Sequence, residues 1–389
     1  MALLLALLIA GPVSAQNAVY HGGTSSDDGD PEKDADGVKN GTVVWAAGKV
    51  HLVDQYSVSS HFVGSTVVPA TLVIQAGAIV KFGGSFQVSN GRVTQWSPPS
   101  GWMQAYGDGS IRINGAIITD IRDDTAGGDT NGDGGASRPP TTGTSQYVIA
   151  FSERPGHQLT GSTIKYCNKI GRVGSMQVTN NRFLFFGMFL SGGGFPLDTG
   201  PVPIDARPVI TGNTFEFAGN GGLNLRGMSA LVEGNTLVKA YRAFEIGPSH
   251  EYGSYNTERR GPNQGVTIIR NNRVEAEYGV TISAARSDSL FEYTQFKAEV
   301  SGNTFTGYCV LCTPQGPPGL VGIEVDMAAD VTVSDNTFDN FRTPISTLYS
   351  NRTQVLRPRI NGNRFNGPIN LTESPRTLPE RFWSKGVFL

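Results

Sequence analysis

Two glutamates of this sequence each stand between apolar residues in a short alternating segment. Glu245 is the central residue of F-E-I, and Glu324 is the central residue of I-E-V, which Asp326 follows directly. Because successive side chains of a β-strand point to opposite faces, a strand that buries the apolar residues points these acids outward. Two outward carboxyl groups can serve as the general acid and general base of glycosidic bond hydrolysis.

Other polar residues accompany these acids and widen the chemistry that is open to them. Asn224 and Arg226 follow the same alternation in L-N-L-R. The polar stretch 247–264 adds five residues that could contact a sugar: His250, Tyr252, Tyr255, Arg259 and Arg260. Aromatic rings can stack on sugar rings, and arginines pair with uronate carboxylates. In a lyase, a calcium ion or Arg226 would neutralise the uronate while Arg259, Tyr252 or His250 took the C5 proton. These residues leave lyase and hydrolase chemistry both open.

A second group of candidate residues has the composition of a calcium loop. Three residues follow the first half of the EF-type pattern, D-x-N-x-D-G: Asp129, Asn131 and Asp133. In that pattern alternate oxygens point to one centre, and the glycine permits a sharp turn. The pattern then breaks, because its twelfth position is Pro140 instead of glutamate. The missing oxygens could come from acids upstream: Asp120, Asp123 or Asp124. We expect a structural Ca²⁺ here, the alternative being a solvated acidic loop with Asx turns.

The elements that would position these residues are visible as a repeat in the second half of the chain. A motif such as G-N-T-F or N-N-R-F recurs around seven asparagines: Asn181, Asn213, Asn235, Asn272, Asn303, Asn336 and Asn363. They are separated by 32, 22, 37, 31, 33 and 27 residues. A short alternating segment precedes each asparagine, as in V-T-V at 331–333, and further strand-like segments follow it.

We interpret a minimum period of 22 residues with three short strands as one coil of a parallel β-helix. Strands this short cannot bury a face alone, whereas stacked coils share one apolar core. We expect the recurring asparagine to adopt the left-handed conformation at a tight corner and its amide to bond the asparagine one coil away. Glu245 and Glu324 would then lie two coils, roughly 10 Å, apart at the backbone, and Asp326 roughly 7 Å from Glu324. Inverting glycosidases hold their carboxyl groups roughly 6.5–9.5 Å apart, so either pairing is suitable.

The G-N-T-F and N-N-R-F corners resemble the right-handed parallel β-helix repeats of the pectin-lyase-like superfamily, over residues 180–371. The resemblance implies an all-β, single-stranded right-handed parallel β-helix. It is specific for the fold and not for the function, because such helices include lyases, hydrolases, epimerases and adhesins. In the catalytic members that this chain resembles, the outward face described above is the usual substrate cleft. The insertions at 191–208, 247–264 and 284–297 all follow this strand, so we expect them on one side of the helix.

The composition agrees with a turn-rich β protein. The chain has 389 residues, of which 50 are glycine, about 13% against roughly 7% in average usage. Charged residues make up 16%, and the formal net charge is −2. Glycine-rich, charge-poor sequence excludes coiled coils and helical bundles. A net charge near zero gives no general attraction to nucleic acid, so we expect no nucleic-acid partner.

Four regions are expected along the chain. Residues 1–15 have the apolar run and small-residue end of a secretory signal peptide, and residues 16–44 form an acidic, glycine-rich mobile segment. The β-helix would occupy residues 45–371, and residues 372–389 would cap it. No other run is long and apolar enough to span a bilayer, so we expect a secreted or cell-surface protein.

The three cysteines do not form a disulfide framework. Cys309 and Cys312, in C-V-L-C, would be a local disulfide or two packed thiols, and Cys167 a core thiol.

These expectations combine into one function with one alternative. We expect a secreted carbohydrate-active protein that binds, and cleaves by lyase or hydrolase chemistry, an extended extracellular polysaccharide that could contain uronates. The alternative is a non-catalytic surface or adhesion module that binds glycan. The sequence does not indicate an oligomeric state.

Overall fold

A computed structural model describes the backbone of eighteen stretches of the chain, and the statements below concern them alone. They are residues 18–21, 37–38, 41–59, 61–63, 66–84, 86–89, 92–97, 101–140, 144–151, 156–171, 174–190, 207–225, 229–247, 266–282, 297–309, 319–326, 330–348 and 358–366. Every regular element in them is a β-strand, and none contains a helix with the length and apolar character of a membrane span.

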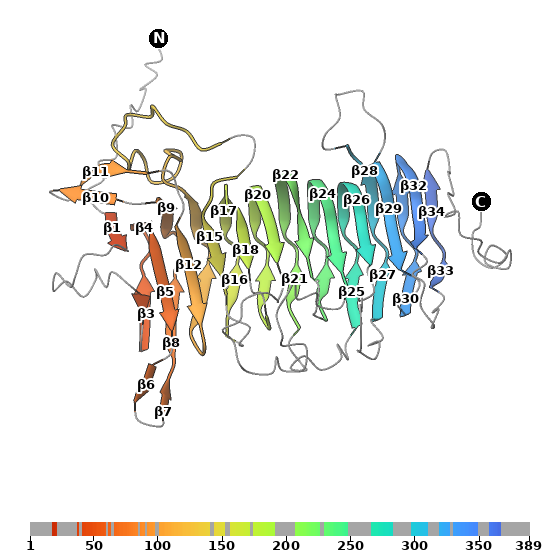
Figure 1. The fold of residues 1–389 in the computed structure, drawn as a ribbon, viewed down its shortest axis with the longest axis horizontal. Coiled ribbons are helices and arrows are strands. Elements are labelled where there is room, and N and C mark those ends of the chain that lie inside the picture. The colour runs from red at the N-terminus through yellow and green to blue at the C-terminus, as the bar shows by residue number, and fades with distance from the viewer. Residues whose placement is uncertain are drawn as a thin grey trace, which may run out of the picture.

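The strands form three parallel columns that run the length of the molecule, stacked side by side from the N-terminal end to the C-terminal end (Figure 1). Column one is an 11-stranded sheet. Its strands are β3 (Gly41–Trp45), β8 (Ala70–Ile74), β13 (Ser110–Asn114), β16 (Gln158–Thr160), β19 (Gln177–Thr179), β21 (Val209–Thr211), β23 (Leu231–Glu233), β25 (Val266–Arg270), β27 (Lys297–Ser301), β30 (Asp330–Ser334) and β33 (Arg359–Asn361).

Columns two and three belong to one 19-stranded sheet, because long strands in the middle of the molecule run through both. Column two contains β1 (Ala18–His21), β4 (Val50–Val53), β9 (Ile79–Phe82), β14 (Ile117–Asp120), β17 (Thr163–Lys165), β28 (Thr304–Gly307), β31 (Thr337–Asp339) and β34 (Arg364–Asn366). Column three contains β2 (Gly37–Val38), β5 (Gln55–Ser59), β12 (Trp102–Tyr106), β15 (Val148–Ala150), β18 (Lys169–Gly171), β29 (Gly319–Asp326) and β32 (Phe341–Leu348). The strands that join the two columns are β20 (Arg182–Leu190), β22 (Thr214–Asn224), β24 (Thr236–Ile246) and β26 (Arg273–Ile282).

This arrangement is the all-β parallel β-helix that the repeat predicts. The coils pass through all three columns in turn, and each strand pairs in parallel with the equivalent strand of the next coil. Two antiparallel hairpins interrupt the pattern near the N-terminal end: β6 (His61–Val63) with β7 (Thr66–Val68), and β10 (Phe86–Ser89) with β11 (Arg92–Trp96). Both project from the stack in Figure 1.

The core lies between the columns and is a stack of apolar side chains, one layer for each coil. Phe183 and Phe215 stack with ring centroids 4.4 Å apart, and Phe338 stacks on Phe305 at 5.3 Å. All four rings are buried. Because burying one such side chain stabilises the fold by about 1.5–3 kcal/mol, the stability of each coil depends on the coils beside it.

The seven recurring asparagines form a continuous hydrogen-bonded ladder inside one corner, which confirms that prediction. The backbone N–H and the amide of Asn181 both donate to Oδ1 of Asn213 at 2.9 Å, and the pattern repeats down to Asn363. Each amide from Asn181 to Asn363 also donates to a carbonyl of column one, as Asn213 does to Val178 at 2.8 Å. All seven side chains are buried, so the ladder satisfies polar groups that would otherwise be costly.

The prediction that these asparagines are themselves left-handed is wrong, because the left-handed residue is the one before. Asn180 has φ of 56° and Gly212 has φ of 66°, and the same holds at Gly234, Asn271, Gly302, Asp335 and Gly362. The chain turns the corner at that preceding residue, which leaves the N–H and amide of the ladder residue directed along the stack. Glycine, asparagine and aspartate are the residues that tolerate this conformation.

The same corner continues into the first half of the chain with smaller residues. Ser162 donates its N–H to Oδ1 of Asn181 at 2.9 Å and so begins the ladder. In the two preceding coils, buried Ala116 and Ala78 follow the left-handed residues Gly115 and Gly77. At Gly115 the chain passes from β13 into β14.

Strand pairing also begins before residue 45, where the sequence analysis places the start of the helix. β3 begins at Gly41, and β1, within the segment expected to be mobile, pairs with β4. The predicted signal peptide and C-terminal cap lie outside the described residues. Cys309 is disulfide-bonded, and burial raises the pKa of the free thiol of Cys167 to about 12.

Candidate functional site

One row of outward side chains crosses column three in the C-terminal half of the molecule. The register aligns Asn224 of β22 with Glu245 of β24, and that glutamate with Thr281 of β26. Thr281 is aligned in turn with Glu324 of β29, and Glu324 with Ser346 of β32. We call these five residues the outer row. Asn224, Glu245 and Glu324 each stand between buried apolar neighbours, so their predicted outward orientation is confirmed.

Glu245 and Glu324 are two strands apart in the outer row, with Thr281 between them. Neighbouring strands lie roughly 4.8 Å apart, so the backbones of the two glutamates are separated by roughly 10 Å. To reach the roughly 6.5–9.5 Å range of inverting glycosidases, the Glu245 carboxylate would have to turn toward Thr281 from its contact with Asn224, which lies on the other side of β24. The hydroxyl oxygen of Thr281 is buried and has no hydrogen-bond partner.

The carboxylate of Glu245 has a donor near each of its oxygens. The amide of Asn224 donates to Oε2 at 3.0 Å, and Nη1 of Arg242 lies 3.7 Å from Oε1. These contacts come from the neighbouring strand and from three residues earlier on the same strand. They orient the carboxylate within the outer row.

Glu324 lies in a different environment. Its side chain is half-buried, and this loss of solvent raises the pKa of the carboxyl group, while the charge of Arg242 acts in the opposite direction. A raised pKa keeps a larger fraction of Glu324 protonated than is usual for a glutamate. Two carboxyl groups in one row thus differ in environment, which is how acid and base roles are separated in glycosidases.

Arg242 completes this surface together with two tyrosines that the sequence analysis did not identify. Its guanidinium lies 5.6 Å from the ring centre of Tyr241 and 5.5 Å from that of Tyr278. The two rings meet edge to face at 5.6 Å. Strict alternation counted back from Glu245 would place Arg242 inside. β24 turns a corner there instead and leaves two successive residues, Tyr241 and Arg242, outside the core. The signal that could have found it is the Y-R pair that directly precedes the buried A-F of that strand.

Several predicted site residues cannot be placed. Six lie outside the described residues: Arg226, His250, Tyr252, Tyr255, Arg259 and Arg260. The backbone of Asp326 ends β29 and pairs with Leu348, but its side chain is outside the described part. The pairing of Glu324 with Asp326 therefore stays a prediction.

The predicted calcium loop lies far from the outer row, after β14. Its residues 121–140 wrap around two aspartates. The carboxylate of Asp129 accepts the N–H groups of Gly132, Asp133 and Gly134 at 2.8–3.2 Å. That of Asp133 accepts N–H groups from residues 135–137 and the Ser137 hydroxyl.

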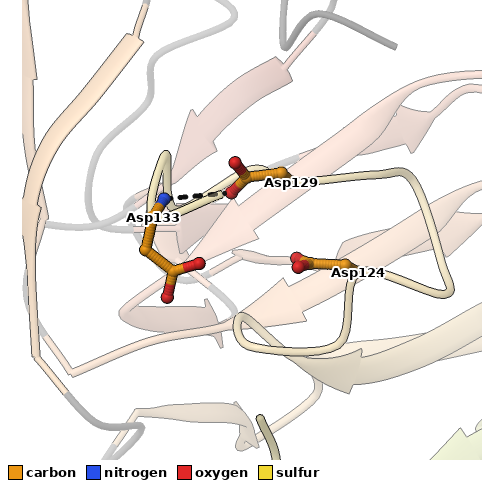
Figure 2. A group of neighbouring side chains, drawn as sticks. All are labelled: Asp124, Asp129 and Asp133. Atoms are coloured by element: carbon orange, nitrogen blue, oxygen red, sulfur yellow. Dashed lines mark hydrogen bonds between the residues drawn. The ribbon is translucent and has the colours of Figure 1, made fainter. Parts of the chain in front are cut away.

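Three carboxylates converge in this loop. One oxygen each from Asp124, Asp129 and Asp133 lies within 4.8 Å of the other two, and Figure 2 shows all three groups facing a common space. We call them the aspartate trio. Asn131, which was also predicted here, is buried against Asp133, to which its amide donates at 2.9 Å.

Asp123, which the sequence analysis included among the metal residues, is not part of the trio. Its oxygens accept bonds from Lys165 at 3.0 Å, from Thr119 at 2.7 Å and from the Thr125 hydroxyl. These donors lower the pKa of the Asp123 carboxyl against the effect of burial. The carboxylate is thus occupied by a lysine that comes from β17, a contact that local spacing could not reveal.

Comparisons with known proteins add little to this geometry. No family model matches the chain, and no curated protein matches it. A search of solved structures found a double mutant of the tailspike protein of E. coli bacteriophage HK620, at 14% sequence identity and a TM-score of 0.32. The match covers 84% of this chain and 60% of the tailspike. A likeness this distant supports no statement about the function of this chain.

Proposed function

We propose that this chain is a secreted glycoside hydrolase that holds an extended, uronate-containing polysaccharide across column three. The observation that carries the proposal is the outer row, in which two outward glutamates flank Thr281 and differ in environment. A row that runs along the stack suits a polymer, because successive coils present side chains to successive sugar units.

In this proposal Glu324 is the general acid and Glu245 the general base. Glu324, whose pKa is raised by burial, gives its proton to the glycosidic oxygen as the bond to the anomeric carbon breaks. Glu245 takes a proton from the water that attacks that carbon from the opposite face. The separation of two strands leaves room for this water and predicts inversion of the anomeric configuration.

Arg242 would bind an acidic sugar beside the scissile bond. Its side chain is 45% exposed, so it can receive a uronate carboxylate. The rings of Tyr241 and Tyr278 beneath the guanidinium offer apolar surface on which a sugar can stack.

A lyase would need a base for the C5 proton, and the predicted bases all lie outside the described residues. We propose hydrolysis because two outward glutamates are aligned in one row and differ in environment, as the acid and base of a glycosidase do.

A non-catalytic glycan-binding module is the second candidate, and one observation favours it. Oε2 of Glu245 has a partner in Asn224 and Oε1 has one in Arg242, as expected for a carboxylate that only holds neighbouring side chains in place. In that case Arg242 and the tyrosines would bind the glycan, and no bond would be cleaved.

Incubation of the purified protein with pectin, alginate, glycosaminoglycans and neutral glycans separates these candidates. A hydrolase releases reducing ends without new absorbance near 235 nm, whereas a lyase produces both. We expect Glu324→Gln and Glu245→Gln each to lower the rate about 100-fold or more, the range for loss of general acid–base catalysis. Glu299→Gln is the matched control, because Glu299 is an exposed glutamate of β27 in column one.

Each outcome of this assay decides between the candidates. Absorbance near 235 nm would replace hydrolysis by lyase chemistry. Binding without any product would leave the non-catalytic module. Full activity in both glutamate variants would remove the outer row as the catalytic site.

A further inference from the structure

We propose that the aspartate trio and Asn131 bind one Ca²⁺, which fastens the loop 121–140 onto the first coils of the helix. This site is separate from the outer row, and the inference does not depend on the proposed function.

The trio concentrates negative charge that a cation would neutralise. Three carboxylates whose nearest oxygens lie within 4.8 Å repel one another unless a positive charge lies among them. Their hard oxygen atoms are the ligands that Ca²⁺ and Mg²⁺ select. Figure 2 shows that they approach the common space from different sides, as ligands of one ion do.

Buried oxygens without donors are the second, independent observation. The side chain of Asn131 is only 5% exposed, and its Oδ1 has no hydrogen-bond partner. The amide nitrogen of the same side chain donates to the Asp133 carboxylate, so this side chain lies against the trio. Oδ1 of Asp124 is likewise buried and without a donor. Buried acceptors are rarely left unsatisfied, and a coordinated cation would satisfy both.

The charges around the loop leave a net negative charge. Arg122 pairs with Asp120 at 2.7 Å, and Lys165 pairs with Asp123 at 3.0 Å, so these cations are committed. Two other cations lie near the trio: the buried ammonium of Lys81, which donates to the carbonyl of Gly128 at 2.7 Å, and the exposed Arg138 of the loop itself. Three negative charges against these two positive charges leave −1, which favours a bound cation.

Calcium fits this site better than magnesium. Ca²⁺ accepts six to eight oxygens in flexible geometry, whereas Mg²⁺ requires a near-ideal octahedron and keeps several waters. Asp129 and Asp133 already accept three or more hydrogen bonds each from the loop. These bonds fix the two carboxylates, so they cannot shift into the ideal octahedral positions that Mg²⁺ requires. Because Pro140 replaces the bidentate glutamate of a complete EF-type loop, we expect affinity in the range of extracellular modules, about 10⁻⁴–10⁻³ M.

The position of the loop shows what the ion would stabilise. Gly127, between Asp124 and Asp129, packs so closely on Val50 and Ile79 that an added methyl group would lie 2.9 Å from the former and 3.4 Å from the latter. Those residues belong to β4 and β9, two of the first coils. A bound ion would hold the loop closed over them and so protect the N-terminal end of the stack.

The test is calcium titration of the full chain after removal of bound metal with EGTA. We expect heat of binding by calorimetry and a higher Tm in CaCl₂ than in EGTA, with a smaller effect of MgCl₂. Asp124→Asn should weaken binding about 10-fold or more without unfolding the loop, because the turns are held by Asp129 and Asp133. Asp339→Asn, which removes an exposed carboxylate of β31, is the control and should bind as the wild type does.

A second variant, Asn131→Asp, tests the site by a gain in calcium binding instead of a loss. A fourth carboxylate against Asp133 should lower the Tm in EGTA, and CaCl₂ should restore it and bind more tightly than to the wild type. The proposal is overturned if CaCl₂ gives neither heat nor a change in Tm, if Asp124→Asn binds like the wild type, or if Mg²⁺ binds as well as Ca²⁺.

Discussion

At the scale of the residue, the ladder asparagines show how one side chain can serve the fold twice. Each Oδ1 from Asn213 to Asn363 accepts two bonds from the coil before it, and each amide from Asn181 to Asn336 donates to the coil after it. Recurrence of the residue was enough to predict this contact. The local conformation was not predictable in the same way, because the spacing does not distinguish the ladder position from the left-handed residue before it.

Loss of a central ladder residue should destabilise the protein strongly. Asn272→Ala removes the acceptor of the buried N–H of Asn235, and it takes one hydrogen bond each from the Asn235 amide and from the carbonyl of Val232. A buried N–H without an acceptor costs about 1–3 kcal/mol and each lost bond about 1 kcal/mol, so we expect a loss of about 3 kcal/mol in the free energy of unfolding, measured by chemical denaturation. Asn366→Ala, at an exposed position of β34, should change stability by no more than about 0.5 kcal/mol. Equal effects of the two variants would contradict this role.

The charge of Arg242 should set the pH dependence of the proposed catalysis. Burial raises the pKa of Glu324 and Arg242 lowers it, and a general acid is active only while protonated. We expect kcat to fall as the pH rises through the pKa of Glu324. Arg242→Gln removes the opposing charge, raises that pKa further and moves the alkaline limb to higher pH. Arg270→Gln, at an exposed arginine paired with Glu233 in column one, should leave the limb in place.

If the alkaline limb of the kcat–pH profile is unchanged in Arg242→Gln, a group other than Glu324 controls that limb.

At the scale of the element, the strands that pass from column two to column three decide which side chains form the site. Along the straight part of a strand, alternation predicted the outward position of Glu245 and Glu324 correctly. At the corner of β24 the alternation breaks, and Arg242 is brought beside Tyr278 of the next strand. Pairing across strands at a bend depends on the local twist, which a single sequence does not specify.

Glycine has two separate uses in these elements, and the two can be distinguished by substitution. A methyl group on Gly279 would lie 2.2 Å from the carbonyl oxygen of Gly322, whereas one on left-handed Gly234 would meet nothing within 4 Å. Gly234→Ala should therefore cost about 1–2 kcal/mol, for the conformation alone. Gly279→Ala should cost about 3 kcal/mol or more, because β26 and β29 must move apart. Thermal denaturation of both variants checks the order, and a reversed order would contradict the close approach of these strands.

At the scale of the whole molecule, the repeat predicted the architecture because each coil has the same needs. Seven coils carry asparagine at the corner and are visible in the sequence. The earlier coils use Ser162, Ala116 and Ala78 there, so their periodicity is hidden although the corner is the same. The ion pair of Asp123 with Lys165 was also hidden, because it joins a loop to a strand 42 residues away.

The site at this scale is a row that exists only because coils stack in register. None of its residues is close to another in the sequence, yet the stack brings Asn224, Glu245, Thr281 and Glu324 onto neighbouring strands.

A crystal structure of the Glu324→Gln variant with an oligosaccharide from the active substrate tests the central proposal most directly. We predict that the sugar lies across β24, β26 and β29, with its scissile bond between Glu245 and position 324 and an acidic group beside Arg242. An oligosaccharide bound on another face, with the outer row bare, would contradict the proposal.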